Sequence, residues 1–221
     1  MMTNLFSIFD PSSSLNLSMN WISVISILFI MPANYWSISS RYQMLWKIIF
    51  IKIFEEIKNN LSMKSQKFIF IYLALFFSIL MFNCLGLMPY VFTPSSHIIL
   101  SMIMAFPLWM TLMLKGWITS FNKMMTHLVP LGSPMMLTFF MVIIETISNL
   151  IRPITLSVRL SANMISGHLL IHLLTSIPFN YPKTITIILP IMLFLMILET
   201  AVAMIQSYVF ITLSSLYTNE I

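Results

Sequence analysis

The chain has 221 residues, of which 59% are hydrophobic and only 8% are charged, and its mean hydropathy is +0.95. Soluble domains carry about a quarter of their residues as charged side chains, so this composition excludes an ordinary soluble protein and indicates a chain that lies mostly in lipid. The net charge of +5 does not indicate nucleic-acid binding, because six of the eleven basic residues fall beside apolar runs, between Arg41 and Lys67. The single Cys84 excludes an internal disulfide and a cysteine-based metal site.

Five uncharged runs are long enough to cross a hydrocarbon core of about 30 Å, which takes roughly 20 helical residues. The first, 15–31, contains several polar residues and is the weakest of the five. The second and third, 68–88 and 97–114, are strongly apolar, and Pro107 predicts a kink in the third. These three runs predict ordinary membrane helices.

Between the first two spans, residues 41–67 mix tryptophan, isoleucine and phenylalanine with lysine and glutamate. This mixture predicts a helix that lies on the membrane surface. Basic residues gather on the side from which a chain inserts, so this segment, Lys115 and Lys123 are expected on that side. With five crossings, the N-terminus then starts outside and the C-terminus ends inside.

The last two runs, 135–175 and 184–217, are much longer than an upright span needs. A continuous helix over the second would be about 50 Å long and would fit a ~30 Å core only at a tilt of around 50°. We therefore expect a tilted hairpin joined by 176–183. The alternative is shorter upright pieces, with breaks at Pro153 or Gly167 in the first run and at Pro190 in the second. The whole chain, 1–221, is predicted to form one all-α transmembrane domain.

Four ionised residues lie within the two long runs: Glu145, Arg152, Arg159 and Glu199. A charge near the middle of a membrane helix costs about 2.5 to 3.5 kcal/mol on insertion scales, so such residues usually face protein or water and have a function. The alternative is that the long side chains extend to the membrane–water interface. This alternative fits Arg159 least well, because Arg159 is near the middle of its run.

The first three of these charges are seven residues apart, and residues seven apart on a helix point in directions that differ by only about 20°. They form one polar stripe with Asn149, Asn163 and Ser166 beside it. The stripe could be a hydrogen-bonded seam against a neighbouring helix. However, Glu145 cannot neutralise both arginines, because Arg159 would lie about 21 Å from it along the axis.

An arginine keeps its proton in proteins, so Arg159 can act as a fixed charge but not as a proton carrier. Its partner is either Glu199 or a carboxylate of another subunit. Glu199 has Gln206 seven residues further on, and His168 and His172 stand one turn apart. Carboxylate, imidazole and amide groups are typical of a proton path. A metal site is the alternative for the two histidines, but a third ligand is missing from the sequence nearby.

At these residues the sequence resembles the subunit a family of F-type ATP synthases, in the mitochondrially encoded form. The most specific segments are IETISNLIRPITLSVRLSANMISGHLL, residues 144–170, and LETAVAMIQSYVF, residues 198–210. The resemblance extends over nearly the whole chain, although the linker at 176–183 matches poorly and Ser161 stands where many relatives have threonine.

The resemblance implies a role for each residue of the candidate site. The family's essential arginine falls on Arg159, its asparagine on Asn163 and its mitochondrial histidine on His168. The acidic residue and the glutamine of the last helix fall on Glu199 and Gln206. The acidic residue of the matrix side falls on Glu145, and we also count His172 and Arg152 among the residues of the proton path and charge barrier.

The resemblance further implies a stator that faces a ring of c subunits, with two half-channels that Arg159 keeps apart. It implies a multi-pass protein of the mitochondrial inner membrane, with the N-terminus in the intermembrane space and the C-terminus in the matrix. Other expected partners are membrane-sector and peripheral-stalk subunits, protons and lipid. Neither nucleic acid, nucleotide, cofactor nor catalytic residues are expected. The competing hypotheses are a self-contained ion transporter and a structural subunit of a respiratory complex.

Overall fold

The computed structural model describes residues 5–12, 18–30, 37–63, 65–88, 91–129, 134–180 and 182–220, and this part of the chain contains helices and no strands. The α-helices, in chain order, are α1 (Ile22–Ile30), α2 (Arg41–Asn60), α3 (Ile69–Gly86), α4 (Ile98–Thr119), α5 (Phe121–Leu128), α6 (Met135–Asn180) and α7 (Ile185–Glu220). Short 3-10 helices are η1 (Leu5–Phe9), η2 (Met19–Trp21), η3 (Gln66–Phe68), η4 (Pro94–Ser96) and η5 (Pro182–Thr184). The prediction of an all-α fold is confirmed.

Within the described residues, four helical segments are long and apolar enough to cross a membrane: Gln66–Gly86, Ile98–Thr119, Leu137–Pro178 and Ile185–Asn219. The chain is therefore a polytopic membrane protein. The first predicted span is different, because α1 has only nine residues and a three-residue 3-10 helix precedes it. Residues 15–17 and 31 of that predicted span lie outside the described residues, so a fifth crossing stays a prediction.

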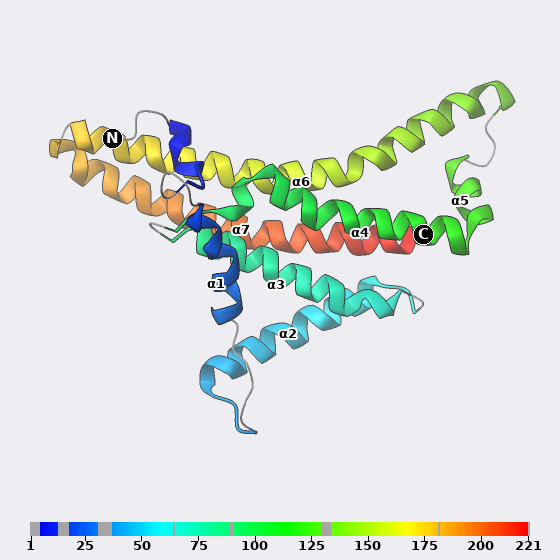
Figure 1. Cartoon of the computed structure of the whole chain (residues 1–221), viewed down its shortest axis with the longest axis horizontal. Coiled ribbons are helices and arrows are strands. Elements are labelled where there is room, and N and C mark those ends of the chain that lie inside the picture. Colours follow the sequence, from blue (N-terminus) through cyan, green and yellow to red (C-terminus); the bar gives the residue numbers. More distant parts are fainter. Residues whose placement is uncertain are drawn as a thin grey trace.

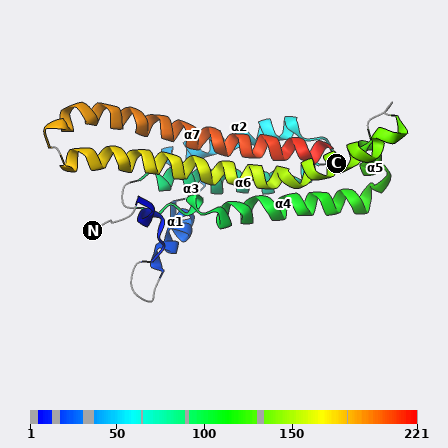
Figure 2. The ribbon, with the colours of Figure 1, turned by 90° about the horizontal axis from the view of Figure 1, so that it is seen from above.

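The two long apolar runs form continuous helices that lie side by side from the hairpin end to about the middle of α6, whereas the start of α6 diverges from α7 (Figures 1 and 2). Helix α6 has 46 residues and α7 has 36, so at ~1.5 Å per residue they are about 69 and 54 Å long. Neither helix breaks at Pro153, Gly167 or Pro190, which overturns the alternative of shorter pieces. The steep tilt against the membrane stays a prediction.

The junction between these helices is shorter than the predicted linker, 176–183. Helix α6 continues through Pro178 to Asn180, and η5 leads directly into α7. A proline inside a helix removes one intrahelical hydrogen bond, and here the helix ends two residues later. The sequence predicts Pro178 in the linker, whereas the structure places it in the last turn of α6.

The surface segment predicted over 41–67 is a helix only as far as Asn60. Its start is set by a capping box, in which the Gln43 backbone N–H donates to Ser40 Oγ (3.4 Å) and the Ser40 N–H donates to Gln43 Oε1 (2.9 Å). One side of α2 packs on α3, with the Phe50 and Phe77 rings stacked 3.9 Å apart. Residues 61–63 and 65 are not helical, and η3 then leads into α3 rather than extending α2.

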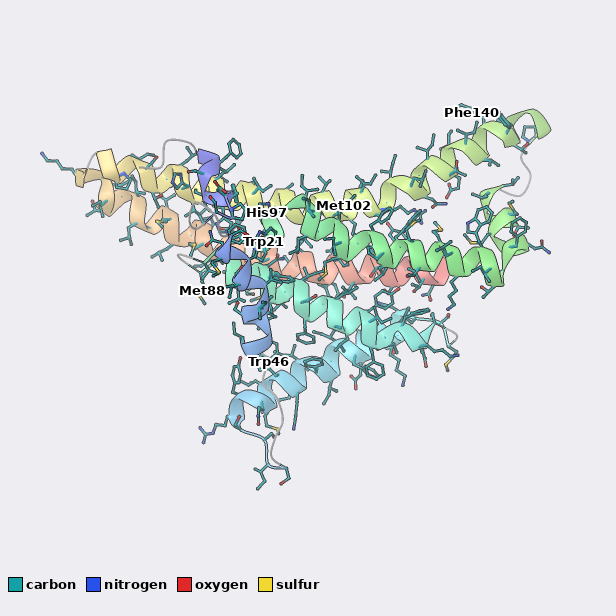
Figure 3. All side chains as sticks on the ribbon, viewed as in Figure 1. Trp21, Trp46, Met88, His97, Met102 and Phe140 are labelled. Carbon is teal, nitrogen blue, oxygen red and sulfur yellow. The ribbon has the colours of Figure 1, made fainter. Side chains whose placement is uncertain are left out.

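The N-terminal part packs across the start of α4. The Trp21 and His97 rings lie 5.4 Å apart, and both are labelled in Figure 3. In Figure 1 the short α1 runs across the direction of the longer helices. Trp21 thus attaches η2 to the bundle through aromatic contacts, and Ile27 of α1 packs with Met81 and Phe82 of α3.

The core of the chain is centred on α3, whereas α6 and α7 are mostly uncovered. Half of the residues in the most apolar 18-residue stretch of Gln66–Gly86 are buried within the chain (50%), against 6% and 11% in the corresponding stretches of Leu137–Pro178 and Ile185–Asn219. Polar contacts cross the core as well, since Asn83 Nδ2 donates to the Ala203 carbonyl (3.5 Å). Lipid or other proteins must therefore cover most of the surface of the two long helices.

Candidate functional site

Helix α6 presents one buried and one exposed face. The buried face packs on the rest of the chain through alternating large and small residues: Leu156, Ser157, Leu160, Ser161 and Met164. Successive helical residues are turned by about 100°, so Arg159 lies on the other side, and its side chain is exposed. Thr155, Ala162 and Ser166 are exposed next to it and have small side chains. We call Thr155, Arg159, Ala162 and Ser166 the Arg159 face.

The two arginines of the predicted stripe have different surroundings. Arg152 Nη2 lies 3.8 Å from Glu145 Oε1, and the Arg152 guanidinium stands 4.7 Å from the centre of the Tyr217 ring on α7. Within the described part of the chain, Arg159 has neither an ion pair nor a hydrogen bond from its side chain. Glu145 thus pairs only with Arg152, because Arg159 is too far from Glu145 along the helix.

An amide pair joins α6 to α7 close to Arg159. Asn163 Nδ2 donates to Gln206 Oε1 at 3.0 Å, and Gln206 is buried. Asn163 lies four residues after Arg159, which is about one helical turn. The structure therefore brings together two of the predicted site residues and fixes the contact of the two helices beside the arginine.

Glu199 is buried between the two long helices and has only 4% of its surface exposed. Its side chain lies directly against Gly167 of α6: a β-carbon at position 167 would stand 2.6 Å from Glu199 Cδ and 3.0 Å from Cγ. With Glu199 in this conformation, only glycine leaves room for its carboxylate, and a larger residue would require the side chain to move. The sequence offered Gly167 as a possible break, whereas the structure gives it a place in the site.

Glu199 and Arg159 are not partners in this fold. The carboxylate touches α6 eight residues beyond Arg159, which corresponds to about 12 Å along the helix axis. Both carboxylate oxygens are buried without a hydrogen-bond partner among the described residues. Of the two candidate partners for Arg159, the internal one is therefore excluded in this arrangement.

The two histidines lie on the same stretch of α6 as the Glu199 contact. His168 follows Gly167 directly, and the centre of its ring lies 6.5 Å from that of the Phe9 ring of η1, with the two rings nearly perpendicular. His168 Nε2 and His172 Nδ1 are buried and, like the Glu199 oxygens, have no hydrogen-bond partner among the described residues. Phe9 was not predicted, because a contact with a residue more than 150 positions away leaves no local signal in the sequence.

The described residues contain no group of three or more histidine, cysteine, aspartate or glutamate side chains that could hold a metal ion. The site is instead a line of polar groups along α6 and α7. It consists of the Glu145 and Arg152 pair, the exposed Arg159, the Asn163 and Gln206 pair, and the buried Glu199 with His168 and His172. All of these groups can hydrogen-bond to water, and the carboxylates and imidazoles among them can also exchange protons, whereas the arginines keep theirs.

The sequence matches the family described as ATP synthase A chain over residues 17–219. Proteins called ATP synthase subunit a are similar to it over the full length of both chains: those of Drosophila simulans (50% identical), Anopheles gambiae (49%) and Aedes aegypti (49%). The match contains every residue of the candidate site. The chain is thus a multi-pass membrane protein that belongs to the ATP synthase A chain family.

Proposed function

We propose that this subunit of the ATP synthase membrane sector is the stator that carries protons to and from the carboxylates of a rotating c-ring, with Arg159 as the barrier between two half-channels. The observation that carries the proposal is the position of Arg159. It is a permanent charge on an uncovered face of a membrane helix, and it has no anionic partner in the described part of its own chain.

A charge in that position calls for a carboxylate from outside the chain, because an isolated charge facing lipid is costly. The rest of the Arg159 face is made of small side chains, which let a neighbouring helix approach closely. A passing c-subunit carboxylate would pair with the guanidinium when ionised and leave it when protonated. The fixed charge would also repel a proton that might otherwise cross directly.

The groups on either side of Arg159 suit the two half-channels. Glu199, His168 and His172 present four buried polar atoms that have no hydrogen-bond partner in the part of the chain that the structure describes, and buried polar atoms normally find one. Water there would connect them, with Asn163 and Gln206 leading toward Arg159. On the other side, Glu145 with Arg152 would receive the proton that leaves the ring.

The remaining features of this proposal concern the cellular setting. The chain would lie in the mitochondrial inner membrane with its N-terminus in the intermembrane space and its C-terminus in the matrix. Its partners would be the c-ring and other membrane-sector and peripheral-stalk subunits. Nucleotide chemistry would belong to other subunits of the complex, so the chain would not be an enzyme by itself.

Disulfide crosslinking in the assembled complex tests the proposal. Cysteines at Ala162 and Ser166, in a Cys84→Ser background, are expected to crosslink to cysteines beside the c-subunit carboxylate and to stop ATP-driven proton pumping. The matched control is Ile154→Cys, since Ile154 is also exposed (46%) but points about 140° away from Arg159 on the same helix. If neither position of the Arg159 face crosslinks, Arg159 has an internal role and the rotor contact is refuted.

A further inference from the structure

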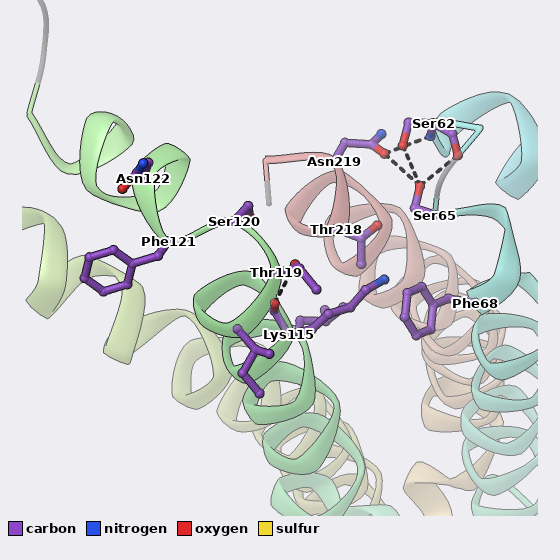
Figure 4. A pocket seen from close by; sticks show the side chains of 12 residues that line it. Ser62, Ser65, Phe68, Lys115, Thr119, Ser120, Phe121, Asn122, Thr218 and Asn219 are labelled. Carbon is purple, nitrogen blue, oxygen red and sulfur yellow. Dashed lines mark hydrogen bonds between the residues drawn. The ribbon is translucent and has the colours of Figure 1, made fainter.

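A cavity of about 840 Å³ with both polar and apolar side chains in its lining lies at the end of the bundle where several helices terminate, and none of the proposed proton-path residues lines it. Its walls come from the end of α4, the start of α5, the turn between α2 and α3, and the last residues of α7 (Figure 4). Three of the four apolar spans begin or end here, at Gln66, Thr119 and Asn219. The cavity is therefore at the level of lipid headgroups.

The turn between α2 and α3 is held to the end of α7 by Asn219. The Ser62 backbone N–H donates to Asn219 Oδ1 at 2.9 Å, and Ser65 Oγ donates to the same oxygen at 3.3 Å. Asn219 Nδ2 in turn donates to the Asn60 carbonyl. These bonds, two of them drawn in Figure 4, give the cavity a fixed wall.

Lys115 is the only charged residue among the described residues that line the cavity. Its Nζ stands 4.2 Å from the centre of the Phe68 ring, and no described carboxylate pairs with it. An ammonium group offers three hydrogen-bond donors and a positive charge. The cavity is thus suited to an anion.

The neighbouring hydroxyl groups add acceptors to this site. Thr119 Oγ1 donates to the Lys115 carbonyl (2.7 Å), and Ser120 Oγ donates to the Gly116 carbonyl (3.1 Å). Because each hydroxyl has one proton and that proton is used within the helix, its oxygen faces a ligand as an acceptor. A ligand that satisfies the whole cavity needs both an anionic group and a hydrogen-bond donor.

Part of the cavity lining is apolar and uncovered, and it continues onto Trp117. Ile118 is 83% exposed, and Trp117 and Phe121, whose rings are 5.5 Å apart, are 45% and 49% exposed. Aromatic side chains favour the boundary between lipid tails and headgroups. A ligand with a polar head and an apolar tail would fit both parts at once.

We propose that this cavity binds the headgroup of a glycerophospholipid. The phosphodiester pairs with Lys115, an ammonium or hydroxyl group of the headgroup donates to Thr119 and Ser120, and the acyl chains lie on Ile118 and Phe121. The phosphate chemistry is shared with free inorganic phosphate, but only the lipid uses the apolar surface. The proposal requires the membrane location of the chain and not the proton path.

Photolabelling of the assembled ATP synthase in phosphatidylcholine nanodiscs tests this assignment. The probe is a phosphatidylethanolamine with a diazirine on the acyl chain next to the glycerol, and labelled peptides are identified by mass spectrometry. We expect labelling of the 117–122 segment that falls about tenfold in Lys115→Gln, because a charge-assisted contact is lost. Lys115→Arg is expected to retain the label. Lys67→Gln, which removes an exposed lysine outside the cavity lining, is the matched control and should not change it.

Thr119→Val provides a second variant that keeps both charge and shape, and we expect about a threefold loss of label from the missing acceptor. The amount of assembled complex on native gels controls for misfolding. Equal labelling of the parent protein and Lys115→Gln would overturn the proposal. So would a complete lack of label in the complex, which would mean that another subunit fills the cavity. Displacement of the lipid by millimolar inorganic phosphate would assign the site to free phosphate instead.

Discussion

The Glu199 carboxylate on α7 rests against Gly167 on α6, so that an added β-carbon would overlap with it at 2.6 Å from Cδ. Gly167→Ala should therefore displace the carboxylate or part the helices. Overfilling a packed site costs about 1 to 3 kcal/mol, and we expect proton pumping driven by ATP hydrolysis to fall several-fold. Ser166→Ala, next to it on the exposed side, should have little effect. Full pumping by a normally assembled Gly167→Ala complex would contradict the assigned role of this contact.

Replacement of Arg159 by lysine should abolish coupled synthesis. An ammonium can lose its proton and cannot form the two-pronged contact of a guanidinium with a carboxylate. We expect ATP synthesis to fall by about two orders of magnitude, because a lysine neither pairs nor stays charged as reliably in lipid. Synthesis rate and passive proton leak are measured together in inverted vesicles.

The control for this substitution is Arg152→Lys, in which a paired arginine on the same helix is changed in the same way. It should retain most of the synthesis, because a lysine can still pair with Glu145. Normal ATP synthesis by Arg159→Lys would refute the barrier role of Arg159.

Glu199→Gln should slow proton uptake without uncoupling the complex. The amide has nearly the same shape as the carboxylate but cannot exchange a proton, and loss of a proton-transfer group commonly reduces rates by about a hundredfold. Proton flux at limiting driving force is the measurement, and Thr200→Ala is a neighbouring exposed control. An unchanged flux would remove Glu199 from the path.

The Asn163 to Gln206 hydrogen bond should contribute to stability as a pair. Such bonds within membranes are worth about 0.6 kcal/mol on average and up to ~1.7. We expect the double variant, with alanine at both positions, to lose little more thermal stability than either single variant. Midpoints of heat-induced dissociation of the complex measure this, and strictly additive losses would show that the two amides do not interact.

The long apolar helices of this fold could be predicted from the sequence because their runs of apolar residues are nearly uninterrupted. The runs that became α6 and α7 were found from the sequence, as were the charges at Glu145, Arg152 and Arg159, because a charge stands out in a long apolar segment. Helix α5 was not predicted, since eight residues of mixed polarity contain little periodic pattern. The end of α2 at Asn60 was also missed, because the basic residues continue beyond it.

The contacts that shape the site were out of reach for a different reason. Gly167 against Glu199 and Phe9 against His168 join residues from separate parts of the chain, and only the packing of the helices brings them together. Periodicity describes one helix at a time and cannot tell which residues of two helices will meet. The sequence therefore indicated which groups have unusual chemistry, and the structure shows which of them are neighbours.

The hydrogen bonds between Asn219 and the turn at Ser62 can form only late in the synthesis of the chain. The two residues are 157 positions apart, so while the chain is being synthesised this turn stays without its partner until almost all of α7 has left the ribosome. Contacts of such long range form late, because most of the chain must first be in place. A premature stop codon at position 219 itself would shorten the last span by only its final residue and yet release the turn between α2 and α3.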